Sequence, residues 1–251
     1  MKIQHISVSR KQLWDQCEQA YKYKYHLELK STEPEPEYFL YGKLVHKVAE
    51  EYVKNKGKIE IESFLKPYIN GELLLENKRV ELSSDYKNKI KSHISNIKKL
   101  NDRIGFEGET EYFFKYDLEP PKEKHVTGVI DRILIKENKC FIIDYKTTKK
   151  GYWRKNPDTI RKDIQLLCYA RVVQKNFGID PENIRAALYY LDGGNLVATK
   201  FNENMLINAE QTLLKTYDDI ITKNPEEVWG RVGNHCSRCE WRKICPFYRL
   251  T

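Results

Sequence analysis

The chain has 251 residues, enough to bury a sizeable core, since a domain of this size hides roughly 70 to 75% of the surface of its unfolded chain. Hydrophobic residues make up 40% and charged residues 32%, a balance that excludes a disordered polymer. The formal net charge of +8 favours a polyanionic partner, because lysines and arginines that neutralise phosphates release condensed counterions.

The sequence shows neither an export signal nor a membrane span. Residues 1–10 lack a continuous apolar region, and no stretch approaches the about 18 apolar residues that a span needs. We therefore expect an intracellular, cytoplasmic protein without a membrane partner. In that setting the six cysteines favour metal binding over a disulfide framework.

Helical periodicity opens the chain. Residues 7–29 are predicted to form a helix with Ser7 or Ser9 as N-cap, until the acidic, proline-containing run 31–37 breaks it. A second helix is predicted over 38–56.

The lysine-rich region 58–105 follows, and its apolar residues recur at helical spacing on two faces, one of which includes Leu73 and Leu74. We interpret it as a helical insertion. Nothing in it indicates chemistry, because a lysine-rich helical face is more often a solvated surface than a binding site.

From Gly108 onward the apolar pattern changes to the alternation of strands. The predicted elements are strands at 109–116, 127–136 and 139–147, a helix at 164–176, strands at 185–191 and 196–201 joined by a hairpin turn, and a helix at 203–223. This order predicts an α/β (α+β mixed) fold, with a central mixed sheet flanked by helices.

Two aspartates interrupt the apolar runs of neighbouring predicted strands. Burying Asp131 and Asp144 is costly unless each carboxylate is paired or bound to a cation. Lys146 lies two positions after Asp144, so both side chains project from one face of the strand. The pair by itself is equally compatible with a structural ion pair. With Asp131 nearby, the set favours a site for Mg²⁺ or Mn²⁺, which prefer hard oxygen ligands.

Two helical patterns accompany these carboxylates. Gly42, His46 and Glu50 fall on one face of the second helix. Gln165 and Tyr169 form an i, i+4 pair on the helix after the Asp-Lys strand. Taken alone, the histidine would more often be structural, and the second pair would be ordinary helix packing.

Together and in this order, these elements resemble the RecB-like branch of the PD-(D/E)XK nuclease superfamily, whose pattern is G-x-x-x-H, G-x-x-D, D-x-K and Q-x-x-x-Y. The matching positions are Gly42 and His46, Gly128 and Asp131, Asp144 and Lys146, and Gln165 and Tyr169. The resemblance covers about residues 42–169. It implies a restriction-endonuclease-like core and a metal-dependent nuclease activity.

The resemblance also implies a role for each residue. The metal ligands would be His46, Asp131, Asp144 and the backbone carbonyl of Tyr145. Lys146 would position the nucleophilic water and stabilise the transition state. Gln165 and Tyr169 would support the site and meet the nucleic acid.

The C-terminal tail carries three cysteines in a C-x2-C-x5-C arrangement, Cys236, Cys239 and Cys245. A tetrahedral site needs one more soft ligand, and Cys17 on the aromatic N-terminal helix is the candidate. His235 is the alternative ligand in a zinc site. The remaining cysteines, Cys140 and Cys168, are interpreted as small buried hydrophobes.

Four thiolates suit either Zn²⁺ or an iron-sulfur cluster. One upstream cysteine with three in a C-terminal run resembles the AddB nuclease domain and the RecB-like nucleases that accompany CRISPR adaptation, which implies a 4Fe-4S cluster on Cys17, Cys236, Cys239 and Cys245. Residues 1–251 are then one nuclease domain, in which 1–30 and 224–251 together form the metal-cluster region.

The resulting hypothesis is a metal-dependent DNA nuclease, an exonuclease that hydrolyses phosphodiester bonds from DNA ends and favours single-stranded DNA. Two alternatives remain open: a non-catalytic DNA-end-binding protein on a nuclease scaffold, and a restriction-type endonuclease. The resemblance implies a prokaryotic or phage context, with partners in recombination, CRISPR adaptation or phage DNA processing, among which the sequence does not choose.

Overall fold

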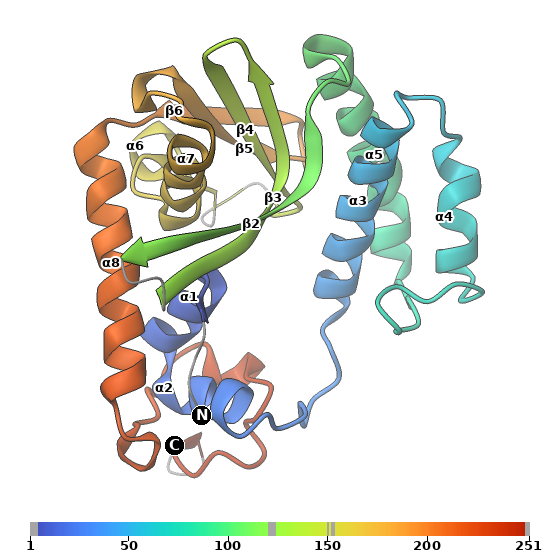
Figure 1. The fold of residues 1–251 in the computed structure, drawn as a ribbon. Helices are drawn as coiled ribbons and strands as arrows, with labels where there is room; N and C mark the ends of the chain where they lie inside the picture. The colour runs from blue at the N-terminus through green and yellow to red at the C-terminus, as the bar shows by residue number, and fades with distance from the viewer. Residues whose placement is uncertain (1–4, 120–123, 150, 152–153, 249–251) are drawn as a thin grey trace. The chain divides into compact units, whose positions relative to one another are not determined.

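A computed structural model of the chain describes residues 5–119, 124–149, 151 and 154–248 (Figure 1). The described residues fall into two compact units, each made from separate stretches of sequence. Unit 1 draws on the ranges 1–35, 114–128 and 207–251, and unit 2 on the ranges 36–113 and 129–206. Each unit is described by itself below.

Unit 1 begins with a two-residue strand and a broken helix. Its elements are β1 (His5–Ile6), α1 (Val8–Gln16), α2 (Glu18–Tyr21), the π-helix η1 (Lys22–His26), most of α8 (Glu203–Thr222), and the short helices η3 (Pro225–Glu227) and η4 (Cys236–Arg238). Ser7 caps α1, where its side chain accepts a hydrogen bond from the backbone of Arg10 (3.2 Å).

The single helix predicted over 7–29 is interrupted at Cys17. The backbone of Cys17 is extended (φ −165°), and the Gln19 N–H donates to the carbonyl of Trp229 (3.2 Å), outside the helix. Cys17 packs instead in a small core with Tyr23 and Trp241. The helix is therefore interrupted where Cys17 and Gln19 contact the distant C-terminal segment.

Unit 2 contains the predicted insertion as two helices. Its helical elements are α3 (Glu37–Lys54), α4 (Ile61–Ile69), α5 (Ser84–Ile104), α6 (Pro157–Ile160), α7 (Ile164–Phe177) and the short η2 (Pro181–Asn183). Ile61, Leu65 and Ile97 from α4 and α5 share one core with α3. Leu73 and Leu74, predicted on an apolar helical face, are exposed because α4 has already ended before them.

The strands form a mixed sheet, as predicted. They are β2 (Glu109–Glu119), β3 (Lys124–Lys136), β4 (Lys139–Lys146), β5 (Ile184–Tyr190) and β6 (Asn195–Lys200). Within unit 2, β3 and β4 are antiparallel, β4 and β5 are parallel, and β5 and β6 form the predicted antiparallel hairpin. In unit 1, β1 pairs with the start of β3 in parallel.

Helices cover both faces of the unit 2 sheet (Figure 1). Successive side chains of a strand point to opposite faces, and Ile143 and Tyr145 of β4 belong to the core that α3 and α5 close. On β4 the alternate residues Asp144 and Lys146 project the other way. Helix α7 packs against β4 and β5, and its Gln165 contacts Lys146.

No helix in the described part of the chain combines the length and the apolar character needed to cross a membrane.

A buried arginine joins β3 to the end of α5. Arg132 is fully buried, and its guanidinium donates to the Asn101 side chain (2.6 Å) and to the carbonyls of Gly105 (2.7 Å) and Glu107 (3.1 Å). These acceptors lie where α5 ends at Gly105, whose φ of 77° favours glycine. Arg132 therefore fixes the chain beside Asp131.

Replacing this arginine should destabilise the fold. We expect Arg132→Met to lower the free energy of unfolding by about 2–4 kcal/mol, because the buried Asn101 side chain and two partly buried carbonyls lose their donor. Urea denaturation followed by circular dichroism measures the change. Arg103→Met, at an exposed position of α5, is the matched control and should shift the stability by less than about 0.5 kcal/mol. Equal stabilities of the two variants would contradict the role of Arg132.

Candidate metal-dependent nuclease site

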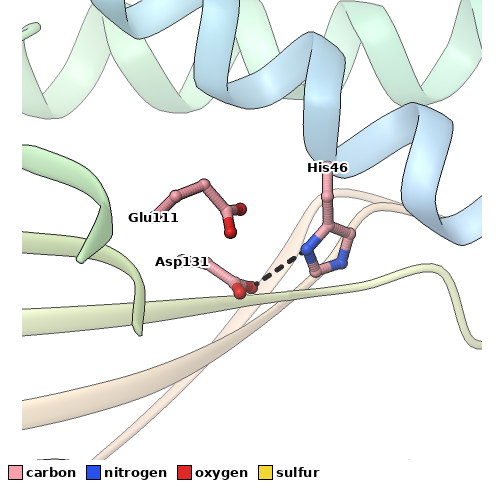
Figure 2. A group of neighbouring side chains, drawn as sticks. All are labelled: His46, Glu111 and Asp131. Atoms are coloured by element: carbon pink, nitrogen blue, oxygen red, sulfur yellow. Dashed lines mark ion pairs between the residues drawn. The ribbon is translucent and has the colours of Figure 1, made fainter. Parts of the chain in front are cut away.

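Three side chains from three elements of unit 2 converge on one point. His46 comes from α3, Glu111 from β2 and Asp131 from β3, and Figure 2 shows them facing one another. One possible ligand atom from each lies within 4.8 Å of the other two. His46 Nδ1 and Asp131 Oδ2 are 3.5 Å apart.

The local structure explains how two of these residues reach the site. Helix α3 buries Leu44, Val45 and Val48, whereas the His46 side chain keeps 31% of its surface exposed. Glu111 has a left-handed backbone (φ 50°) within a strand, a conformation that costs a non-glycine residue on the order of 1–3 kcal/mol. Such strain is commonly retained where a side chain is aimed at a functional site.

A second group of side chains extends from the sheet to α7. Lys146 Nζ lies 2.7 Å from Asp144 Oδ2 and donates to Gln165 Oε1 (3.1 Å). Gln165 in turn donates from Nε2 to the Tyr169 hydroxyl (2.7 Å). Asp163 caps α7 by accepting hydrogen bonds from the first backbone N–H groups, which fixes the helix end that carries Gln165.

The two aspartates differ in their acidity. Burial and the neighbouring charge of Asp131 raise the pKa of Asp144 to about 6, against the opposing charge and hydrogen bond of Lys146. Burial alone would also raise the pKa of Asp131, but the charge and hydrogen bond of His46 and the Tyr145 N–H (2.7 Å) lower it overall. The pair therefore places one firmly ionised carboxylate beside one that titrates near neutrality.

The two basic groups remain protonated at neutral pH. Burial by itself lowers the pKa of His46, but the charges of Asp131, Asp144 and Glu111 outweigh it and raise this pKa to about 9. Burial likewise opposes the ammonium of Lys146, whose pKa is nevertheless raised by Asp144. Lys146 can therefore stabilise negative charge or orient water, whereas it is not available as a proton acceptor.

The residues fit a divalent metal ion. An imidazole and two carboxylates lie close enough to share one cation, and burial raises the pKa of Glu111 with help from the charge of Asp131, so added positive charge would relieve their repulsion. Bound there, an ion would supply Lewis acidity and a more acidic water.

The residues singled out by the sequence motifs meet in this site. His46 and Asp131 belong to the convergent group, and the Tyr145 backbone contacts Asp131. Asp144 contacts Lys146 and is not part of the three-residue group, so its role as a metal ligand stays a prediction. Glu111 was not predicted: it is one of several alternating acids in this segment, and only its backbone conformation distinguishes it.

The four predicted cysteine ligands lie together in unit 1. Cys17, Cys236, Cys239 and Cys245 line one small cavity of about 20 Å³, to which His235 also contributes. Burial raises the pKa of the Cys239 thiol, and the nearby Cys17 adds to the effect.

Contacts between the two distant segments of unit 1 hold this cavity together. The Thr32 N–H donates to the carbonyl of Glu240 (2.9 Å), Trp241 Nε1 donates to the carbonyl of Leu29 (3.4 Å), and Arg242 pairs with Glu33 (3.1 Å). Cys140 and Cys168 are buried in unit 2, as expected for small hydrophobic residues.

The cysteine sulfurs do not have the spacing of a single bound ion. Zinc holds thiolates at about 2.3 Å, which places tetrahedral sulfurs about 3.8 Å apart. Among the residues that the structure describes, no three cysteine or histidine ligand atoms in this region lie within 4.8 Å of one another. The predicted iron-sulfur cluster is therefore not shown by the geometry.

A mixed sheet that carries the Asp144-Lys146 pair beside the His46-Glu111-Asp131 group defines a candidate metal-dependent hydrolase. The sequence profile of the PD-(D/E)XK nuclease superfamily matches residues 5–246, and the chain belongs to this superfamily. A solved structure described as "Crystal structure of SSO0001" shares 18% identity, covers 98% of this chain and 88% of its own, and has a TM-score of 0.48. No curated protein matches the chain.

The acidity of His46 makes metal binding dependent on pH. Because the imidazole must lose its proton to become a ligand, affinity for Mn²⁺ should increase between pH 7 and pH 9, by up to about tenfold per pH unit, and level off above the pKa of about 9. Isothermal titration calorimetry in two buffers of different ionisation enthalpy measures affinity and proton release together. His46→Ala should remove both the slope and the released proton. An identical slope in that variant would exclude His46 as a ligand.

Proposed function

We propose that this chain is a Mg²⁺- or Mn²⁺-dependent deoxyribonuclease that hydrolyses phosphodiester bonds from DNA ends and favours single-stranded DNA. One observation carries the proposal: the His46-Glu111-Asp131 group and the Asp144-Lys146 pair are brought together by neighbouring strands and one helix. Superfamily membership supports a nuclease, and hard oxygen donors with one imidazole suit these two ions.

The residues of the site would have different roles in phosphodiester hydrolysis. Water adds to the phosphorus atom, and the bond from phosphorus to the leaving sugar oxygen breaks. The Lys146 ammonium, oriented by Gln165, can stabilise the negative charge that develops on the phosphate oxygens. Asp144 holds the same ammonium in place from the strand. We propose that Asp144 and the Tyr145 carbonyl also contribute metal ligands.

The preference for ends rests on the RecB-like motifs rather than on geometry. A restriction-type endonuclease would share the carboxylates and the lysine but would also cleave closed DNA. A DNA-end-binding protein on a nuclease scaffold would need none of the charge arrangement around Asp131 and Lys146. The intact set of groups therefore favours an enzyme over a scaffold.

Cleavage assays test the assignment directly. With Mg²⁺ or Mn²⁺ the chain should degrade end-labelled linear DNA, single-stranded faster than duplex, and leave a covalently closed circle intact, and EDTA should stop the reaction. Lys146→Ala should lower the rate at least about a hundredfold, because charge stabilisation at the phosphate is lost.

Lys139→Ala, at an exposed position of the same strand, is the matched control and should keep the parental rate. Cleaved circles would establish the endonuclease alternative. Full activity of the Lys146 variant would refute the assigned site.

We also propose that Cys17, Cys236, Cys239 and Cys245 bind one 4Fe-4S cluster with a structural role. Their shared cavity supports four ligands from two distant segments. The choice of a cluster over zinc rests on the resemblance of the cysteine pattern to iron-sulfur nucleases and not on the positions of the sulfurs. Zinc with His235 as fourth ligand is the alternative.

Anaerobically purified protein should therefore be brown, with broad absorption near about 400 nm. Cys17→Ala should lose the colour and lower the thermal midpoint, because the ligand that joins the two segments is gone. Cys168→Ala keeps all four proposed ligands and should stay brown. A colourless parent with one equivalent of zinc would refute iron, and a fully loaded Cys17 variant would point to His235 as the ligand.

A further inference from the structure

An open groove of about 700 Å³ in unit 2 leads to the metal-binding group. His46 and Glu111 both line it, so anything that reaches the candidate metal site through this groove passes along α3. At the start of the same helix the groove is lined by Tyr38 and Phe39. The proposed function leaves this part of the groove without a role.

Tyr38 and Phe39 form an exposed aromatic pair. They keep 46% and 49% of their surface accessible, although large aromatic side chains are usually buried in a core. Their rings are stacked, with centroids 4.9 Å apart and an interplanar angle of 28°. The pair offers flat apolar surface to the groove, of the kind on which nucleobases stack.

Between this pair and His46, the groove is lined by Gly42, which has no side chain. Tyr38, Gly42 and His46 follow one another at intervals of four residues, which places them along one side of α3. Glycine inside a helix costs about 0.5–1 kcal/mol relative to alanine. A Cβ on Gly42 would meet only ordinary contact with Thr147 (3.8 Å), so packing does not demand the glycine. An extended ligand lying along the groove would account for it.

The charges of the groove do not make it a phosphate track. Lys43 pairs with Glu76 (2.7 Å), and Lys47 pairs with Glu50 and Glu51 (3.0 Å each). With its lysines neutralised by glutamates, the groove offers little net attraction to a polyanion. Recognition along this wall must therefore come from the aromatic faces.

We propose that Tyr38 and Phe39 form a stacking platform that holds unpaired nucleobases of the DNA strand entering the nuclease site. The inference rests on the proposed function and specifies its substrate. Bases in a duplex are already stacked on their neighbours, so the platform selects single-stranded or frayed DNA. His46 lies eight positions after Tyr38, about 12 Å along the helix, so the stacked base lies about two to four nucleotides from the bond that is cut.

Binding measurements on a cleavage-deficient chain test the platform. In the full-length Lys146→Ala protein, the added pair Tyr38→Leu and Phe39→Leu should weaken binding of a single-stranded oligonucleotide at least about tenfold. Binding of a blunt duplex should change less than about twofold. Leucine keeps the apolar character of both positions, so the aromatic face is the property removed. Fluorescence anisotropy reports affinity, and quenching of 2-aminopurine in the oligonucleotide reports stacking.

Two controls separate stacking from other effects. The exchange Tyr38→Phe with Phe39→Tyr keeps both rings and should retain affinity and quenching. Phe177→Leu removes an exposed ring at the end of α7, outside the groove, and should leave binding unchanged.

The outcomes are distinct from those of the cleavage assay. Single-strand affinity within about twofold of the parent in the leucine pair would overturn the platform, as would loss of binding in the aromatic exchange. Absence of single-strand binding by the Lys146→Ala parent would also overturn it. If the unsubstituted chain fails to cleave DNA while the leucine pair still loses single-strand binding, the proposed enzyme is wrong and the platform stands.

Discussion

The burial of Asp131 and Asp144 in neighbouring strands is the constraint on which unit 2 depends. The side chain of Asp144 is only 2% exposed and that of Asp131 12%, and removing such charges from water costs several kcal/mol each. His46 and Lys146 supply the compensating positive charge. His46 can do so only because α3 packs on the sheet through its apolar face, so the core and the charge balance of the site are specified together.

Much of this fold could be predicted from local sequence patterns. Alternation in β3 and β4 and the turn before β6 are local signals, and the structure confirms the strands and their mixed arrangement. The break at Cys17 could not be predicted in the same way. It depends on a hydrogen bond between Gln19 and Trp229, 210 positions apart in sequence, and periodicity carries no information about such a pairing.

In the candidate site, too, sequence spacing indicated some residues and could not indicate another. Fixed spacings indicated His46 and Lys146, because four-residue and two-residue intervals map directly onto one face of a helix or strand. Asp131 was indicated because it interrupts the apolar run of a strand. Glu111 lies among other acidic residues, and its selection depends on a left-handed backbone that no spacing encodes. The cysteines were likewise grouped by their sequence pattern, whereas the group that they could bind depends on the distances between their sulfurs.

The two units are made from alternating stretches of sequence, so their last residues are synthesised at different times. Every residue of the candidate nuclease site lies between positions 36 and 206, in unit 2, whereas the cysteine cavity of unit 1 also requires positions 236–245. A ribosome therefore synthesises all the residues of the candidate site before the last of these cysteines. If these cysteines take up a cofactor, they do so on a chain in which every residue of the candidate site has already been synthesised.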